Sequence, residues 1–145
     1  MAISANRIDD YFTRYAATLT NLDAGAWAKL WGEPGVIVDD RASMVAESRE
    51  AMVQGLSMSF PLYKKLGLAS VRHEVCDSTA VSEKLALVHV RFDFVDADGD
   101  ALSDITSYYL LRDNGFGLQA TVCIETDAAE KLQTLAAERG VELPG

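Results

Sequence analysis

The chain has 145 residues, 49% of them hydrophobic, and a formal net charge of -9. This length fits one domain with a substantial core. The acidic balance argues against nucleic acid and anionic membranes as partners, because both favour a basic surface. No apolar run reaches the roughly 18 residues that cross a bilayer, and acids stand where a signal peptide has its apolar stretch. We therefore expect a cytoplasmic protein.

The first half of the chain is predicted to form two helices, two short strands and a third helix. Apolar residues spaced three or four apart indicate the helices, and Gly and Pro mark their ends. The expected ranges are about 5–22, 24–31, 36–38, 44–46 and 48–66. Pro61 lies within the third helix and has no N–H to donate, so we expect a kink or a break near Phe60.

The second half is predicted to form four long strands and a last helix. The expected ranges are 69–79, 85–95, 102–113, 117–125 and 127–139. Asp98-Gly99 and Asn114-Gly115 are dipeptides typical of two-residue hairpin loops. Consecutive strands joined by tight turns indicate an antiparallel sheet, and helices segregated from them indicate an α+β fold. We expect a single domain over residues 1–145, with its core at about 5–126 and a C-terminal helix at about 127–139.

Two-residue loops would fix which side chains share a face of the sheet. The face expected to pack on the helices carries Val88, Val90, Phe92, Phe94, Ile105, Ser107, Tyr109, Leu111, Ala120, Val122 and Ile124. The other face carries His89, Arg91, Asp93, Asp104, Thr106, Tyr108, Thr121, Cys123 and Glu125. A three-residue loop at Asp98-Gly99 would reverse this assignment. A turn at Ser82-Glu83 would set His73 opposite Phe92, unless the strand bulges between Cys76 and Ser82.

The order and spacing of these elements over residues 5–126 resemble the nuclear-transport-factor-2-like superfamily. That group includes ketosteroid isomerases, scytalone dehydratase, SnoaL-like polyketide cyclases and limonene epoxide hydrolase. The resemblance implies a cone-shaped, curved antiparallel (mixed) sheet wrapped around the N-terminal helices, a cystatin-like α+β barrel with a deep apolar pocket. It also implies a homodimer formed through the outer sheet face. Two strands would separate Cys76 from Cys123, about 14 Å, which is too far for a disulfide.

Individual residues also resemble site residues of enzymes in this superfamily. Arg14-Tyr15 resembles the Arg-Tyr pair on the first helix of ketosteroid isomerase, and Asp40 resembles its general base in spacing. The second acid of that enzyme would fall at or near Tyr109. Together with His73, these residues offer the residue types of scytalone dehydratase. Arg91-Phe92-Asp93 is similar to the Arg-x-Asp of epoxide hydrolase, but we expect it outside the pocket, with no acid facing inward from the last strand.

These positions predict a site for a small apolar or aromatic molecule. The chain would be a cofactor-independent isomerase, dehydratase or cyclase in which Asp40 moves a proton, Tyr15 or Tyr109 polarises an oxygen, and His73 is a further acid or base. The expected lining is Trp27, Trp31, Met52, Leu56, Phe60, Val90, Phe92, Ser107, Val122 and Ile124. No metal or other cofactor is expected, because a hairpin explains the run Asp96, Asp98 and Asp100.

The alternative is a non-catalytic ligand-binding or dimerisation domain on the same fold. Asp40 would then only cap its turn, Tyr15 would be a core tyrosine, and His73 would be satisfied by a neighbour. The two hypotheses differ in where Asp40 points. Catalysis needs it inside a pocket near Tyr15 or His73, whereas exposure to bulk solvent would remove its catalytic role.

Overall fold

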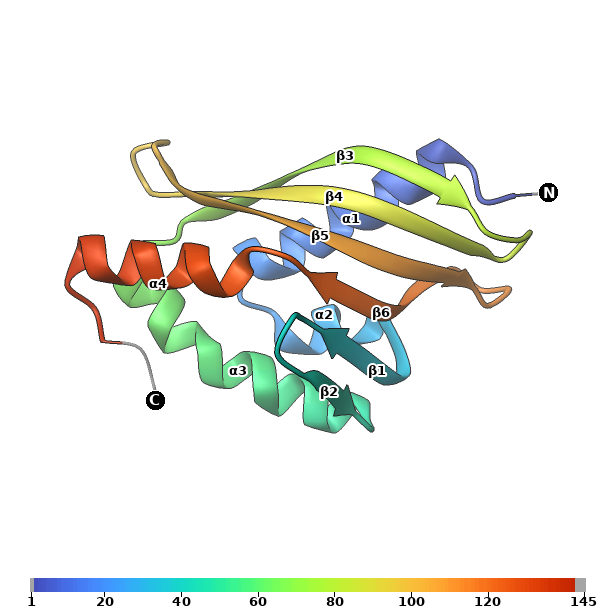
Figure 1. The fold of residues 1–145 in the computed structure, drawn as a ribbon, viewed down its shortest axis with the longest axis horizontal. Coiled ribbons are helices and arrows are strands. Elements are labelled where there is room, and N and C mark those ends of the chain that lie inside the picture. The colour runs from blue at the N-terminus through green and yellow to red at the C-terminus, as the bar shows by residue number, and fades with distance from the viewer. Residues whose placement is uncertain (1, 143–145) are drawn as a thin grey trace.

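A computed structural model describes residues 2–142 (Figure 1). Its elements, in chain order, are α1 (Ala5–Thr20), α2 (Ala24–Lys29), β1 (Trp31–Val38), β2 (Ser43–Ala46), α3 (Arg49–Leu66), β3 (Ser70–Ala80), β4 (Leu85–Val95), β5 (Ala101–Asp113), β6 (Leu118–Glu125) and α4 (Ala128–Arg139). Every predicted element is present. The largest difference is in β1, which begins at Trp31 rather than Val36. None of the helices in this described part is both long and apolar enough to cross a membrane.

The six strands form one curved, open sheet in the order β2-β1-β6-β5-β4-β3. β1 runs parallel to β6, and all other neighbours are antiparallel. The helices lie along one side of this sheet (Figure 1), so the predicted α+β class is confirmed. Cys76 on β3 and Cys123 on β6 are both free, with β4 and β5 between them, as expected.

The main core lies between α1 and the inner face of the sheet. Ser4 caps α1 by accepting a hydrogen bond from the Arg7 N–H. One stripe of α1 is buried against the strands: Ile8, Tyr11, Phe12 and Tyr15. Each such large side chain, when fully buried, contributes about 1.5–3 kcal/mol to stability. α1 and the sheet therefore form the stable scaffold of the molecule.

α3 runs without interruption through Pro61, so the predicted break is wrong. Proline at this position removes the helical hydrogen bond to the carbonyl of Ser57. Both residues are exposed, and water can therefore satisfy that carbonyl. Gly67 ends the helix in the left-handed conformation, at φ 89°.

The hairpin of β4 and β5 keeps its predicted register through two deviations that cancel. Phe92 lies opposite Ile105, as predicted. The loop comprises residues 97–99, one more than expected, which alone would exchange the two faces. A bulge at Leu102 adds one residue to β5 and restores the register.

The hairpin of β3 and β4 behaves in the same way. His73 lies opposite Phe92, as predicted. The loop is residues 82–84, again one longer than expected, and a bulge at Cys76 compensates for it. The side chains of β3 that precede the bulge therefore keep their predicted faces.

The hairpin of β5 and β6 does not keep its predicted register. Its loop spans residues 114–117, two longer than expected. An even number of extra residues leaves the faces unchanged, so up to Ala120, which is buried as predicted, the side chains of β6 keep their predicted faces. A bulge at Thr121 then shifts the pairing by one residue, and nothing cancels it. Beyond this bulge every side chain of β6 lies on the face opposite to the predicted one.

The exchange changes the composition of both faces. Cys123 is buried in the core, and Glu125 lies opposite the buried Ser107. The prediction that Val122 and Ile124 face the helices is wrong, since Ile124 is 39% exposed on the outer face. The expectation that the last strand presents no acid to the interior is wrong as well.

Candidate functional site

Two of the predicted catalytic residues, Tyr15 and Tyr109, lie inside the main core. The Tyr109 hydroxyl donates a hydrogen bond to the Tyr15 hydroxyl over 3.2 Å. Their rings pack edge to face, with Phe12 and Phe92 against both. Burial raises the pKa of both hydroxyls, so both stay neutral. Neither tyrosine is among the residues that line the cavity between α3, α4 and the sheet.

Most of the predicted lining residues belong to the same packed interior. Fully buried in it are Trp31, Met52, Val90, Phe92 and Ser107. Half-buried at its edge or along α3 are Trp27, Leu56 and Phe60. None of the predicted lining residues is among those that line the cavity of about 460 Å³ between α3, α4 and the sheet.

His73 lies at the rim of the core, between β3 and α1. Its Nε2 is 2.9 Å from the Oδ1 of Asp9, and its side chain is 14% exposed. Asp9 extends from the exposed side of α1. Asp9 thus satisfies the hydrogen-bonding capacity of His73 Nε2. The structure does not bring His73 together with Asp40.

Asp40 is exposed, so its expected position in an apolar pocket mouth is wrong. The inward positions of β1 alternate through Gly35 and Ile37, and this alternation continues to Asp39. Asp39 is half-buried, and its Oδ1 accepts the backbone N–H groups of Arg41 and Ala42. The acid at the end of β1 that turns inward is therefore one residue earlier than predicted.

A cavity of about 460 Å³ lies next to the core, and its lining residue Ile105 is paired with Phe92, which packs on both tyrosines. Its walls come from α3, α4 and the inner face of the sheet, where β4 and β6 end and β5 begins. The lining is mainly apolar: Met44, Leu66, Leu68, Phe94, Leu102, Ile105, Ala128, Ala129, Leu132 and Leu135. Only five polar residues take part: Ser59, Tyr63, Ser103, Glu125 and Lys131. Apolar walls with few polar groups are typical of small-molecule sites.

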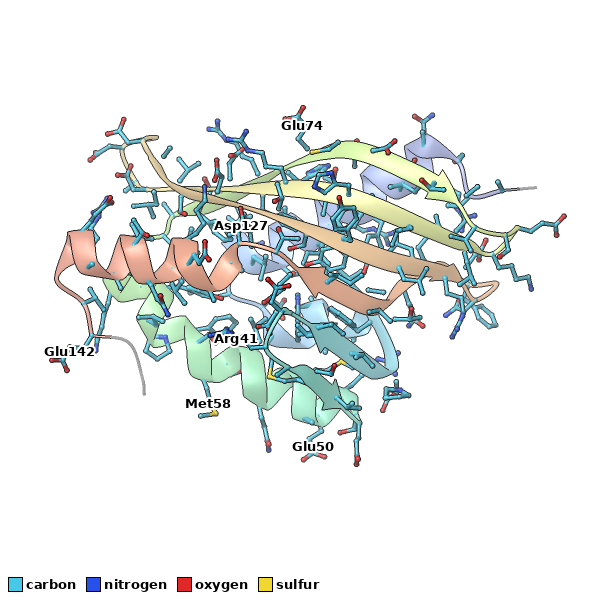
Figure 2. The ribbon with its side chains drawn as sticks, viewed as in Figure 1. Arg41, Glu50, Met58, Glu74, Asp127 and Glu142 are labelled. Carbon is cyan, nitrogen blue, oxygen red and sulfur yellow. The ribbon has the colours of Figure 1, made fainter. Side chains whose placement is uncertain are left out.

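Glu125, the last residue of β6, is the acid of this cavity. Burial raises its pKa, and the negative charge of Asp39 raises it further, while Arg41 opposes this shift. Within residues 2–142 no hydrogen bond or ion pair holds its carboxyl group. Figure 2 shows Arg41 on the turn that follows β1, and its charge reaches Glu125 at the end of β6. Both effects favour the protonated form of Glu125, and a carboxyl group at the edge of an apolar cavity can act as a general acid or base.

Tyr63 on α3 and Lys131 on α4 flank the same cavity. Burial and the negative charge of Glu125 raise the pKa of Tyr63, so its hydroxyl stays protonated and can donate a hydrogen bond. Lys131 Nζ lies 2.5 Å from the Asp104 Oδ1, which neutralises its charge at the rim. Chemically, the cavity offers the titratable carboxyl group of Glu125, the phenol of Tyr63 and the hydroxyls of Ser59 and Ser103 among apolar walls.

The sequence-based reasoning missed both Glu125 and Tyr63. The predicted register places Glu125 on the outer face, because no sequence pattern indicates the bulge at Thr121. Tyr63 lies at the apolar spacing of its helix, which by itself does not distinguish a site residue from a core residue. One usable signal existed, since alternation along β1 points to Asp39 rather than Asp40.

The acidic loop between β4 and β5 is explained by its own hydrogen bonds. The carboxylates of Asp96, Asp98 and Asp100 lie within 4.8 Å of one another. Asp96 Oδ1 accepts the N–H groups of the other two residues. These hydrogen bonds are those of a hairpin loop, which is one residue longer than the predicted turn.

Solved structures similar to this chain share its fold. A domain of unknown function with a cystatin-like fold from Nostoc punctiforme is 14% identical, with a TM-score of 0.69 over 94% of this chain and 98% of that one. An NTF-2 like protein of unknown function from Shewanella oneidensis is 12% identical, with a TM-score of 0.70 over 86% and 100%. A ketosteroid isomerase-like protein from Erwinia carotovora atroseptica is 16% identical, with a TM-score of 0.63 over 83% and 93%.

Comparison with curated proteins gave no match. A family model described as NTF2-like protein (DUF6841) matches residues 5–127, nearly the same span over which the element order predicted the resemblance. The chain therefore belongs to this NTF2-like family.

Proposed function

We propose that this protein binds a small, neutral, largely apolar molecule in the cavity between α3, α4 and the sheet, and that Glu125 moves a proton on it. The observation that carries the proposal is the position of Glu125. It is the one acid in the lining, its pKa is raised, and apolar side chains surround it. This keeps the predicted class, a cofactor-independent isomerase or lyase, but gives the proton shuttle to Glu125 instead of Asp40.

The polar groups of the cavity indicate the chemistry of the ligand. Tyr63 and the protonated form of Glu125 both donate hydrogen bonds, so the complementary group on the ligand is an acceptor such as a carbonyl oxygen. Lys131 is already paired with Asp104 and does not favour an anion. A ketone with an acidic carbon–hydrogen bond fits these requirements. Ionised Glu125 would take the proton from carbon while Tyr63 stabilises the enolate oxygen, and the proton would then return to the ligand.

Binding can be tested with prodan, a neutral naphthyl ketone whose emission moves to shorter wavelength in apolar surroundings. We expect it to bind the wild-type protein. Ala129→Trp would fill the cavity with an indole ring, because Ala129 lines it, and should abolish binding. Ala137→Trp is the matched control, since Ala137 is exposed on the same helix and should leave binding unchanged.

Proton transfer can be tested on the same ketone by mass spectrometry in D₂O. The wild-type protein should exchange the protons beside the carbonyl for deuterium, and Glu125→Gln should lower this rate by about 100-fold, the usual contribution of a positioned acid or base. Asp40→Asn should leave the rate unchanged. Exchange that persists in Glu125→Gln would refute the role of Glu125. Binding without any exchange would favour the alternative, a non-catalytic ligand-binding domain.

We also propose that the outer face of the sheet packs against a second copy of the chain. Two rows of residues cross β4, β5 and β6 on this face: Leu87, Leu110 and Val122, and His89, Tyr108 and Ile124. The rings of His89 and Tyr108 are stacked, with centroids 4.4 Å apart. The bulge at Thr121 supports the proposal, because it adds two apolar side chains to this face.

A further inference from the structure

Asp39 and Glu125 stand at the ends of two neighbouring parallel strands. β1 pairs with β6 in the register Ile37 opposite Cys123 and Val38 opposite Ile124. β1 ends at Val38, and continuing this register by one residue sets Asp39 beside Glu125, whose pKa the charge of Asp39 raises. Residues that are paired in register project to the same face of a sheet, and Ile37 and Cys123 both face the core. The two carboxyl groups therefore turn toward the same side.

The turn after β1 holds Asp39 in place. Its Oδ1 accepts the N–H groups of Arg41 and Ala42 at 2.8 and 3.0 Å, and its Oδ2 lies 3.2 Å from the guanidinium of Arg41. These hydrogen bonds, followed by the charge of Arg41, lower the pKa of Asp39. Glu125 has no such partners within residues 2–142. One carboxyl of the pair is thus fixed and ionised, and the other is the one that takes up a proton.

Other charged or titratable groups face Glu125 from each element around it. Tyr63 on α3 is neutral, and Lys131 on α4 is paired with Asp104. On β5 the residue opposite is Ser107, which does not titrate. The remaining charges are Asp39 and Arg41, both on the turn after β1. This turn is therefore the local element whose charge can set the protonation of Glu125.

We propose that Asp39 is a positioning residue for Glu125: from the end of β1 it repels the ionised form of Glu125, so that Glu125 and not Asp39 carries the exchangeable proton of the cavity. The inference rests on the proposed function in that it takes Glu125 as the proton carrier. Two carboxyl groups whose surroundings favour opposite protonation states are typical of acid–base sites. Asp39 acts here through Glu125 and does not touch the ligand.

The test is a pH titration of the chemical shift of the Glu125 carboxyl carbon, Cδ, measured by ¹³C NMR on the ligand-free protein. The signal is assigned by its loss in Glu125→Gln. In Asp39→Asn the titration midpoint of Glu125 should move to lower pH, because a repelling negative charge has been removed. Asparagine keeps the Oδ1 acceptor for the two N–H groups, so the turn should remain folded.

Two further variants make the result decisive. Asp40→Asn removes the same charge from the adjacent, exposed position, and its shift should be clearly smaller than that of Asp39→Asn. Arg41→Gln removes the opposing positive charge and should move the midpoint to higher pH. If Asp39→Asn unfolds the turn, Asp39→Ser replaces it in the titration, because a serine hydroxyl can also accept a backbone N–H group and carries no charge.

Three outcomes for the titration midpoint of Glu125 would each overturn the proposal. The first is an equal shift in Asp39→Asn and Asp40→Asn, and the second is no shift in Asp39→Asn. The third is a shift to lower pH in Arg41→Gln. The titration needs no ligand. A failure of prodan to bind would therefore count against the proposed function while leaving the coupling of Asp39 and Glu125 measurable. Where deuterium exchange is observed, its pH profile should move to lower pH in Asp39→Asn, a change that a purely structural role of the turn would not produce.

Discussion

Glu125 shows at the level of one residue what the environment does to a carboxyl group. Folding moves it from water to the edge of an apolar cavity, beside the negative charge of Asp39. Both changes penalise the ionised form. Its pKa is therefore higher in the folded protein than in the unfolded chain, and stability depends on pH through this group.

The sign of this dependence gives a prediction for Glu125→Gln. A group with a raised folded-state pKa stabilises the fold fully below its unfolded pKa, and this contribution is lost as pH rises through the folded pKa. Glutamine cannot ionise, so the variant should melt at a higher temperature than the wild type at neutral pH. The difference should shrink as pH falls toward the unfolded pKa of glutamate, about 4.3.

Thermal unfolding followed by circular dichroism across this pH range measures the effect. Glu142→Gln is the matched control, because Glu142 is exposed near the C-terminal end of the chain (Figure 2). It should melt like the wild type at every pH. A Glu125→Gln variant that melts lower than the wild type at neutral pH would contradict the prediction.

At the level of elements, β1 depends on the close approach of its backbone to the core. A Cβ atom on Gly35 would lie 2.7 Å from Trp31 Cε3 and 2.9 Å from Met52 Cε. Trp31 is buried and its rigid ring has no room to move away, whereas Met52 Cε is the end of a flexible side chain, so the contact with Trp31 decides the cost. Glycine is therefore needed here for space, and its conformational freedom is not the reason, since its φ is not positive.

Gly35→Ala should consequently destabilise the protein by about 1–3 kcal/mol, the usual cost of overpacking a core. Gly32→Ala is the control in the same strand, because its nearest contact would be 3.7 Å, an ordinary van der Waals distance. Urea unfolding of both variants measures the difference. Equal losses would mean that the strand, rather than the contact with Trp31, is sensitive to substitution.

The strands and helices themselves could be predicted from the sequence, because periodicity, caps and turn residues act locally. The registers of the hairpins are harder to predict, because loop length and bulges both change the pairing of the strands. At His73 and at Ile105 the predicted pairing is confirmed only because an extra loop residue and a bulge cancel. At Thr121 the bulge has no counterpart, and the faces exchange. A bulge bends a strand within a curved sheet. The position of the bulge therefore depends on the curvature of the sheet, which no local sequence pattern predicts.

For the whole molecule, the exchange of faces on β6 has consequences on both sides of the sheet. It brings Glu125 to the cavity and exposes Ile124 on the outer face. If a second copy packs there, Ile124→Glu should weaken self-association about tenfold or more, because it places a charge at the centre of an apolar contact. The fold should survive, since the side chain is already exposed.

Sedimentation over a concentration series measures this association. Phe116→Ser is the control: Phe116 is fully exposed, but it lies in the loop between β5 and β6, away from the two rows on the outer face. It should leave the association unchanged. A wild-type protein that stays monomeric throughout the series would refute the proposed interface.

The amino-acid sequence by itself determined the α+β class, the order of the elements and the resemblance to the NTF2-like fold. These follow from patterns a few residues long. Only the tertiary structure decided which acid enters the cavity. Tyr15 and Tyr109 have the residue types of a site but fill the core, whereas Glu125 reaches the cavity through a bulge and a parallel pairing with β1. The physical reason is that a side chain's surroundings depend on strand register and curvature, which many distant residues set together.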